Sequence, residues 1–214
     1  MARATKLRSA IADGYDSRTL AGQARQRRWK ELLRRFADFQ DMTIVDLGGD
    51  TRYWRSAPVR PAHVTLVDPV GYHLDAPEDW MTTIVGDACD PDLGLDGFDL
   101  CHSNSVIEHV GGPHRRRQFA ENVMASATHH WIQTPYRYFP VEPHWLFPGF
   151  QFLPLPARAW IGPRWPIAPP MGDPVAAALD IDLVTITELR HLFPSSDLWT
   201  ERIGGIVKSL VMVR

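Results

Sequence analysis

Apolar residues in the middle of the chain gather in short runs that end at Asp, Gly or Pro. Five such runs follow one another, at Thr43–Leu47, His63–Asp68, Thr82–Val85, Phe98–His102 and His130–Gln133. Helical or turn segments separate them, such as the Gly- and Pro-free stretch Arg115–Ala127, and this alternation favours a parallel sheet with helices on both faces. The connections between the strands are then right-handed crossovers. The pattern predicts an α/β fold of the Rossmann-like kind.

The C-terminal region departs from this alternation. Thr187–Phe193 has the pattern of a short helix, with Thr187 as its N-cap and Pro194 as its stop. Leu198–Ile203 and Ile206–Val213 are strand-like runs joined by two glycines, which is a strong hairpin signal. We therefore predict a mostly parallel, seven-stranded sheet that ends in an antiparallel hairpin, unlike ordinary dinucleotide-binding folds.

The segment before the first strand predicts an amphipathic helix within residues 17–39. Its apolar side chains recur at roughly helical spacing, at Leu20, Ala24, Trp29, Leu32, Leu33 and Phe36. Arginines fill most of the other positions, so we expect a basic side in water. Residues 1–36 hold ten Arg or Lys and three Asp or Glu, about +7, against about −9 for the remainder. Because the remainder is acidic and no recognised nucleic-acid-binding motif is present, we expect no nucleic-acid partner.

Composition narrows the class of protein. The 214 residues are 44% hydrophobic and 22% charged, as in globular domains. No apolar stretch is long enough to span a membrane, and the first residues lack the apolar core of a signal peptide. The two cysteines cannot form a disulfide framework. We expect a cytoplasmic monomer or homodimer with one domain over residues 1–214, a basic helical segment over 1–40 and no membrane partner.

Prolines and aromatic residues concentrate in residues 135–174. This segment contains 11 of the 18 prolines. Its aromatic residues are Tyr136, Tyr138, Phe139, Trp145, Phe147, Phe150, Phe152, Trp160 and Trp165. Prolines restrict φ, and the aromatic content argues against disorder, so we predict a stiff, largely irregular insertion. We interpret it as a cover for a substrate pocket; a dimer interface or a packed structural insertion is the alternative.

Polar residues collect where the predicted strands end, the edge at which open α/β sheets bind ligands. They are Asp46 and Asp50, Asp68, Asp87, and Ser103 with Asn104. Asp68 follows Asp46 by 22 residues, close to the ~20-residue spacing of an acid that binds a ribose, and a carboxylate can accept bonds from both ribose hydroxyls. Gly48 and Gly49 allow backbone to approach a ligand. The ordered set indicates a nucleotide-like ligand.

Five segments carry a resemblance to a known family. IVDLGGDTRYW, TLVDP, IVGDACD and FDLCHSNSVIEHV occur in this order, followed by TELRHLFPSSDLWTERIGGIVKSLVMVR. Together they resemble the successive motifs, last helix and hairpin of class I S-adenosylmethionine-dependent methyltransferases, above all the small-molecule group called methyltransferase type 11. The resemblance covers about residues 40–134 and 185–214. It implies a Rossmann-like methyltransferase fold and S-adenosylmethionine as cofactor.

The resemblance also implies roles for residues at four strand ends. In the family, the first-strand acid and the glycine loop hold the methionine part of the cofactor, and the acid after the second strand binds its ribose. The Gly-Asp pair after the third strand flanks the adenine, and the segment after the fourth lines the methyl-transfer face. In the same order, these positions are Asp46, Gly48 and Gly49; Asp68 and Pro69; Asp87 and Ala88; and Ser103, Asn104, Glu108 and His109.

Two residues depart from the family's glycine loop. Where the family usually has glycines, two and four positions after Gly48, this chain has Asp50 and Arg52. Larger side chains there crowd the cofactor or shape the turn differently. This keeps open a catalytically weak relative that serves as a binding or partner protein. An NAD-dependent oxidoreductase is a further alternative, which the loop and the C-terminal hairpin disfavour. For the basic helix, a cap on the cofactor cleft and a solvated face both stay open.

Methyl transfer from a sulfonium is an in-line displacement, to which an enzyme contributes alignment and a dry pocket. A base is needed when the nucleophile keeps its proton, as a phenol or alcohol does, and histidine titrates near neutrality. His109 and His144, the latter beside Glu142, are the catalytic candidates. We expect O-methylation of a small phenolic, sugar or other natural-product hydroxyl. Without a phosphate loop, a nucleophile elbow or an acid-rich metal set, we expect no NTP hydrolysis, no hydrolase activity and no metal.

Overall fold

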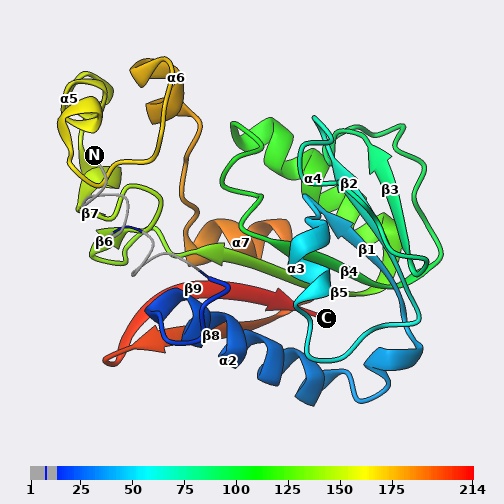
Figure 1. Ribbon diagram of the computed structural model, residues 1–214. Helices are drawn as coiled ribbons and strands as arrows, with labels where there is room; N and C mark the ends of the chain where they lie inside the picture. Colours follow the sequence, from blue (N-terminus) through cyan, green and yellow to red (C-terminus); the bar gives the residue numbers. More distant parts are fainter. Residues whose placement is uncertain (1–7, 9–13) are drawn as a thin grey trace.

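A seven-stranded sheet forms the centre of the computed structural model, which describes residue 8 and residues 14–214. The strand order is β3-β2-β1-β4-β5-β9-β8 (Figure 1). The strands are β1 Thr43–Leu47, β2 His63–Asp68, β3 Met81–Val85, β4 Phe98–Asn104, β5 Ala127–Pro135, β8 Asp197–Ile203 and β9 Ile206–Val213. The first five pair in parallel, and β9 is antiparallel to both β5 and β8. The predicted fold class is confirmed.

The hairpin β8–β9 turns at the two glycines that predicted it. Ile203 pairs with Ile206, so the connection has two residues, Gly204 and Gly205, with φ of +56° and +85°. A two-residue turn with positive φ at both positions matches the right-handed twist of the strands, and glycine adopts it without strain.

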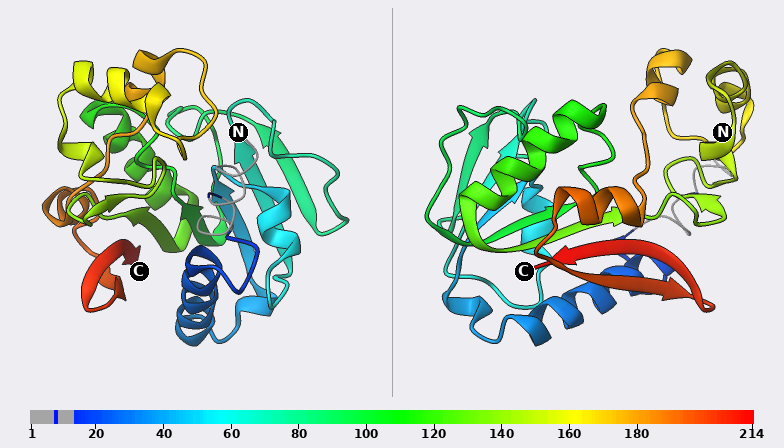
Figure 2. Two further views of the ribbon diagram at one scale, coloured as in Figure 1. Left: turned by 60° about the vertical axis from the view of Figure 1, so that its left-hand side comes forward. Right: turned by 180° about the vertical axis from the view of Figure 1, so that it is seen from behind.

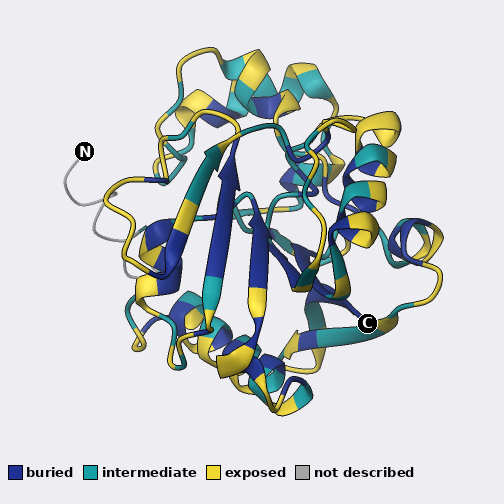
Figure 3. Ribbon diagram, turned by 90° about the vertical axis from the view of Figure 1, so that its right-hand side faces the viewer, coloured by how far each residue is buried: buried dark blue, intermediate teal, exposed yellow. Residues whose placement is uncertain are grey.

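Helices cover both faces of the sheet, as predicted (Figure 2). On one face, α2 (Leu20–Arg35) and α3 (Thr51–Arg55) pack Trp29, Leu32 and Trp54 against the strands. On the other, α4 (Pro113–Ser126) and α7 (Ile186–Leu192) contribute Phe119 and Leu189. The central strands between these two cores are almost wholly buried (Figure 3). None of the helices in the described residues has the length and apolar character that crossing a bilayer requires.

The helix α2 confirms the amphipathic prediction but corrects the picture of a basic side in water. Thr19 caps it by accepting a bond from the Gly22 amide. Arg28 pairs at 3.0 Å with Glu201, whose side chain is 1% exposed, because a buried carboxylate needs a partner. Arg25 turns toward the strand ends of the sheet, as described below. Arg25 and Arg28 therefore point toward buried groups rather than into water.

The short helix α7 begins earlier than predicted. Its N-cap is Thr185, not Thr187, and the Thr185 hydroxyl accepts a bond from the Glu188 amide. Both threonines suit a cap by residue type. The extended backbone of Thr185 decides between them.

The insertion is more regular than predicted and projects beyond the carboxyl end of β5 (Figure 1). Its elements are β6 Val141–Glu142, β7 Phe147–Pro148, the 3-10 helices η2 Phe150–Phe152 and η3 Gly162–Arg164, α5 Leu155–Ile161 and α6 Pro174–Leu179. Trp145 stacks on Phe150 with ring centroids 4.4 Å apart, and both are buried. A Cβ on Gly162 would lie 2.6 Å from the Trp145 ring. The insertion therefore has a small aromatic core of its own.

We predict an acid-sensitive contribution to stability from His130 on β5. Burial, with the charges of Arg214 and His129, lowers its pKa to about 4. Between pH 6.5 and 4 the unfolded chain binds a proton that the folded chain excludes, so the free energy of unfolding falls as the pH falls, by on the order of 3 kcal/mol. Urea denaturation at pH 7 and pH 4 measures this loss. His130→Gln, which keeps a polar group facing Ser196, should lose less, and equal losses in both proteins would contradict the assignment.

Candidate active site

The loop after β1 is held close to the sheet and needs glycine. The amides of Gly48 and Gly49 both donate to the carbonyl of Val67 on β2, at 2.8 and 3.0 Å. Gly48 has φ of +82°, and a Cβ there would lie 2.2 Å from Cγ2 of Val106. The loop backbone is thus clamped between β2 and the segment that follows β4.

Asp46, at the end of β1, is buried and bonded within the protein. Its carboxylate accepts from Trp54 Nε1 at 2.7 Å and from His102 Nδ1 at 2.8 Å. The His102 Nε2 lies 3.3 Å from the Tyr53 hydroxyl. Asp46 therefore fixes α3 and β4 beneath the loop. Its predicted contact with the methionine part of the cofactor stays a prediction.

Asp50 and Arg52, which stand where the family usually has glycines, both have structural roles. Asp50 caps α3 by accepting from the Arg52 amide at 2.7 Å, and its other oxygen accepts from the Tyr15 hydroxyl at 2.9 Å. The guanidinium groups of Arg52 and Arg25 both lie over the Tyr15 ring, 3.9 and 4.1 Å from its centroid. At φ of −130°, Asp50 needs no glycine. Both side chains therefore have partners within the chain, and their effect on cofactor binding stays a prediction.

A small pocket of about 180 Å³ opens at this edge of the sheet. Its lining combines the N-terminal region with the strand ends: Tyr15, Arg25, Asp46, Gly48, Asp50, Tyr53, His73 and Asn104. Arg25 Nε and Nη1 are buried and have no hydrogen-bond partner among the described residues. Two buried guanidinium nitrogens without an acceptor are costly, so the pocket is suited to an anionic group such as a carboxylate. No spacing in the sequence pointed to Arg25 or Tyr15 as site residues.

The two remaining acids that are predicted to bind the cofactor, Asp68 and Asp87, are not in the lining of this pocket. Asp68 Oδ1 accepts from the amides of Val70 and Gly71, which closes a turn after the exposed Pro69. Asp87, beside the buried Ala88, accepts from the Cys89 amide and pairs with Arg115 at 2.8 Å. Burial opposes ionisation of Asp87, but the Cys89 amide and the Arg115 charge lower its pKa overall.

Ser103 and Asn104, adjacent on β4, have different surroundings. Ser103 is buried, and its hydroxyl donates to the Leu47 carbonyl at 2.7 Å, so it ties β4 to β1. Asn104 lines the pocket. The structure thus brings Asp46, Gly48 and Asn104 to one cavity and gives Ser103 a partner inside the sheet.

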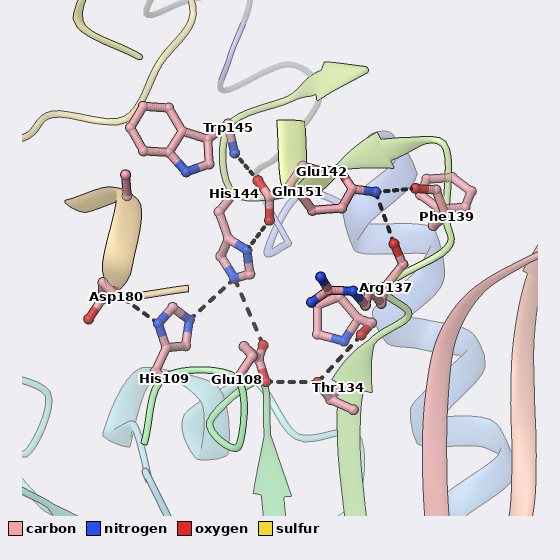
Figure 4. Close-up of polar contacts among 12 residues, drawn as sticks. Glu108, His109, Thr134, Arg137, Phe139, Glu142, His144, Trp145, Gln151 and Asp180 are labelled. Carbon is pink, nitrogen blue, oxygen red and sulfur yellow. Dashed lines mark hydrogen bonds and ion pairs between the residues drawn. The ribbon is translucent and has the colours of Figure 1, made fainter. Parts of the chain in front are cut away.

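The two predicted catalytic histidines meet, although 35 residues separate them (Figure 4). His109 follows β4, His144 lies between β6 and β7, and their Nε2 atoms are 3.3 Å apart. His109 Nδ1 lies 3.0 Å from Asp180, and His144 Nδ1 lies 2.7 Å from Glu142, the contact expected from the sequence. Glu108 Oε1 is 3.8 Å from His144 Nε2. Burial disfavours protonation of His144, but the bond and charge of Glu142, with Glu108 and Asp180, raise its pKa.

This cluster opens on a second pocket, of about 430 Å³. Most of the pocket wall comes from the insertion and from the chain that follows it, including Trp145, Pro169, Pro170, Met171, Ala177 and Ile181. Arg8 also lines it, and its guanidinium donates to the carbonyls of His144 and Ile167 at 2.8 Å. A mostly apolar cavity with a few convergent polar groups is typical of small-molecule sites.

Sheet order, helical layers and the ligand edge together define the class I S-adenosylmethionine-dependent methyltransferase fold. No family model and no curated protein sequence matches the chain. Among solved structures, an S-adenosylmethionine-dependent methyltransferase from Mesorhizobium loti has a TM-score of 0.59 at 13% identity, over 89% of this chain and 96% of that one.

Two further similar structures were solved with S-adenosylhomocysteine bound. The 1,6-didemethyltoxoflavin-N1-methyltransferase of Burkholderia thailandensis, which also holds its substrate, has a TM-score of 0.52 at 16% identity, over 99% of this chain and 85% of that one. The magnesium protoporphyrin IX methyltransferase of Synechocystis has a TM-score of 0.54 at 12% identity, over 89% and 84%. At these identities the likeness shows the fold alone.

We predict that Gly48→Ala destabilises the protein more than Gly205→Ala does. Both glycines have φ above +80°, so each alanine pays about 1–2 kcal/mol of backbone strain. Only the Gly48 Cβ also collides, with Val106, which adds about 1–3 kcal/mol of overpacking, whereas the space around Gly205 is open. Chemical denaturation of the two variants gives the difference. Equal losses would show that the loop is not clamped as described.

Proposed function

We propose that this chain is an S-adenosylmethionine-dependent methyltransferase of the small-molecule, type 11-like group, and that it methylates a hydroxyl oxygen. The observation that carries the proposal is the pairing of two sites at neighbouring strand ends. One is the glycine-loop pocket, where Arg25 Nε and Nη1 have no hydrogen-bond partner among the described residues. The other is the His109–His144 cluster on the second pocket. Similar structures that hold S-adenosylhomocysteine support the choice of cofactor.

The residues at the ligand edge fit this cofactor. Arg25 presents unpartnered donors suited to the carboxylate of the methionine part, beside Gly48 and Asn104. Asp68 and Asp87 lie at the ends of β2 and β3, where the resemblance implies ribose and adenine. The pocket of about 180 Å³ then takes one end of the cofactor, and the remainder extends along the sheet edge.

The cofactor supplies an electrophilic methyl group: its carbon–sulfur bond breaks as the carbon–oxygen bond forms, leaving neutral S-adenosylhomocysteine and a proton from the acceptor hydroxyl. The chain aligns the acceptor and handles that proton. His109 and His144 line the second pocket and are the side chains that can accept this proton. The insertion lines this pocket mainly with apolar side chains, which limits the water around the acceptor. We infer a small acceptor with an apolar body and at least one hydroxyl.

Calorimetry tests the cofactor assignment through Arg25. We predict that wild-type protein binds S-adenosylmethionine and S-adenosylhomocysteine but not NAD, and that Arg25→Met weakens both by about 10- to 100-fold through the loss of charge-assisted bonds. Arg27→Met, an exposed position on the same helix, is the matched control and should bind normally. Binding of NAD alone would overturn the proposal. Methyl transfer to a panel of phenols and sugars, followed by mass spectrometry, then tests for the O-methyl product.

Two substitutions at Asp68 can separate its proposed contact with the ribose from its role in the turn. Because Oδ1 is held by two backbone amides, Oδ2 is the atom left to face the ribose. Asp68→Asn keeps an oxygen for the turn and loses the second acceptor, so we predict about 10-fold weaker cofactor binding with little change in unfolding free energy. Asp68→Ala should lose binding and also about 1–2 kcal/mol of stability. Normal binding by Asp68→Asn would sink the ribose assignment.

A further inference from the structure

Three hydrogen-bond acceptors converge beside the second pocket. Glu108 Oε1, His109 Nε2 and His144 Nε2 lie within 4.8 Å of one another (Figure 4). They come from the segment after β4 and from the β6–β7 connection. Each residue is fixed by other contacts, so the convergence is built into the fold.

Both imidazoles turn Nδ1 toward a carboxylate, which leaves their Nε2 atoms facing each other. His109 Nδ1 faces Asp180 at 3.0 Å and His144 Nδ1 faces Glu142 at 2.7 Å. An ionised carboxylate only accepts, so each Nδ1 donates to its carboxylate, and a ring held in this way binds a metal through Nε2. The two Nε2 atoms lie 3.3 Å apart, and Glu108 Oε1 lies 3.8 Å from that of His144. One cation at their centre is within reach of all three atoms.

Glu108 strengthens the case because one of its oxygens accepts no hydrogen bond from the described residues, with His144 Nε2 3.8 Å away. The side chain is fully buried, and Oε2 accepts from the Thr134 hydroxyl at 2.9 Å. Oε1 is buried with no hydrogen-bond partner among the described residues. Arg8, the nearby arginine of the pocket, donates to two backbone carbonyls instead. A buried carboxylate oxygen left in this way is costly unless an ion binds it.

Geometry and donor type select the kind of ion. Two nitrogens bound to one tetrahedral ion at ~2.0–2.1 Å lie about 3.3–3.4 Å apart, which is the separation of the two Nε2 atoms. Two imidazoles and one carboxylate suit Zn²⁺ and its first-row neighbours, whereas Mg²⁺ and Ca²⁺ prefer oxygen ligands. Carboxylates behind both Nδ1 atoms are the usual outer partners of metal-binding histidines.

We propose that Glu108, His109 and His144 bind one divalent transition-metal ion, with Zn²⁺ as the best-fitting case, and leave a coordination position open toward the second pocket. No metal is predicted from the sequence, because the segment after the fourth strand lacks an acid-rich metal set; a Glu-His pair and one histidine 35 residues later have no recognised ligand spacing either. The third ligand, His144, belongs to the insertion and meets the Glu-His pair only in the folded chain.

The open position gives the ion a role that rests on the proposed methyltransferase function. A hydroxyl bound to such an ion loses its proton near neutral pH, and that proton passes to solvent. The acceptor oxygen is then an alkoxide or phenoxide held beside His109 and His144. The substrate class becomes a hydroxyl compound able to bind a metal, with an apolar body against Pro169 and Met171.

Metal binding is measured on the full chain, prepared without a histidine tag, stripped with a chelator and dialysed against Zn²⁺. We expect one Zn²⁺ per chain by mass spectrometry of the elements, and an intense visible spectrum with Co²⁺ from a site of low coordination number. Glu108→Gln, His109→Asn and His144→Asn should each weaken Zn²⁺ binding by at least about 100-fold, and Glu142→Gln by about 10- to 100-fold. His191→Gln, at an exposed histidine, should bind Zn²⁺ as the wild type does.

Absence of stoichiometric Zn²⁺ or Co²⁺ binding by the wild-type chain would overturn the metal site, as would unchanged affinity in the three ligand variants. Glu142→Gln and the wild-type Co²⁺ spectrum decide the matter if a ligand variant fails to fold. Calorimetry with S-adenosylmethionine is independent of these readouts. A chain that binds Zn²⁺ but not the cofactor refutes the proposed function alone, and one that binds the cofactor but no metal refutes this inference alone.

Discussion

The buried carboxylate of Asp46 is the constraint on which the ligand edge depends. Its burial makes partners obligatory, and the two it has, Trp54 and His102, belong to α3 and β4. His102 continues the contact to Tyr53, whose ring stacks on Trp29 of α2 at 5.1 Å. One carboxylate thus fixes the helix after the glycine loop, the neighbouring strand and, through aromatic packing, the helix that carries Arg25. An acid at this position holds the site together whether or not it also touches a ligand.

Features that depend on a local sequence pattern could be predicted from the sequence. Features that depend on distant residues meeting in the folded chain could not. Apolar runs ending in turn residues are local, so β1 to β5 and the Gly204–Gly205 hairpin followed directly. Thr185 and Thr187 are the same residue type, so the backbone conformation decides which of them caps α7. Arg25 precedes the glycine loop by more than twenty residues, and its place in the pocket depends on how α2 packs. Glu108 and His109 were recognised as a pair, but their meeting with His144 depends on the path of the insertion.

The insertion explains how a histidine outside the sheet can be held accurately. Glu142 uses one oxygen for the His144 ring and the other for the Trp145 amide, so ring orientation and backbone turn are fixed by the same carboxylate. Trp145 is anchored in turn against Phe150 and Gly162. Prolines limit the backbone freedom of the rest of the segment. The insertion is therefore held in place by a small aromatic core and by the Glu142 carboxylate, which has two partners.

The spacing between the two pockets follows from a single turn after β4. Asn104 lines the glycine-loop pocket and Glu108 belongs to the cluster on the second pocket, only four residues later. Ser105 between them has φ of +60°, and its amide and hydroxyl both donate to Gln133 on β5. Left-handed backbone at a non-glycine residue is uncommon and persists where surrounding bonds determine it. Because Thr134 of β5 also donates to Glu108, the same strand holds both ends of this turn and fixes Glu108 relative to Asn104.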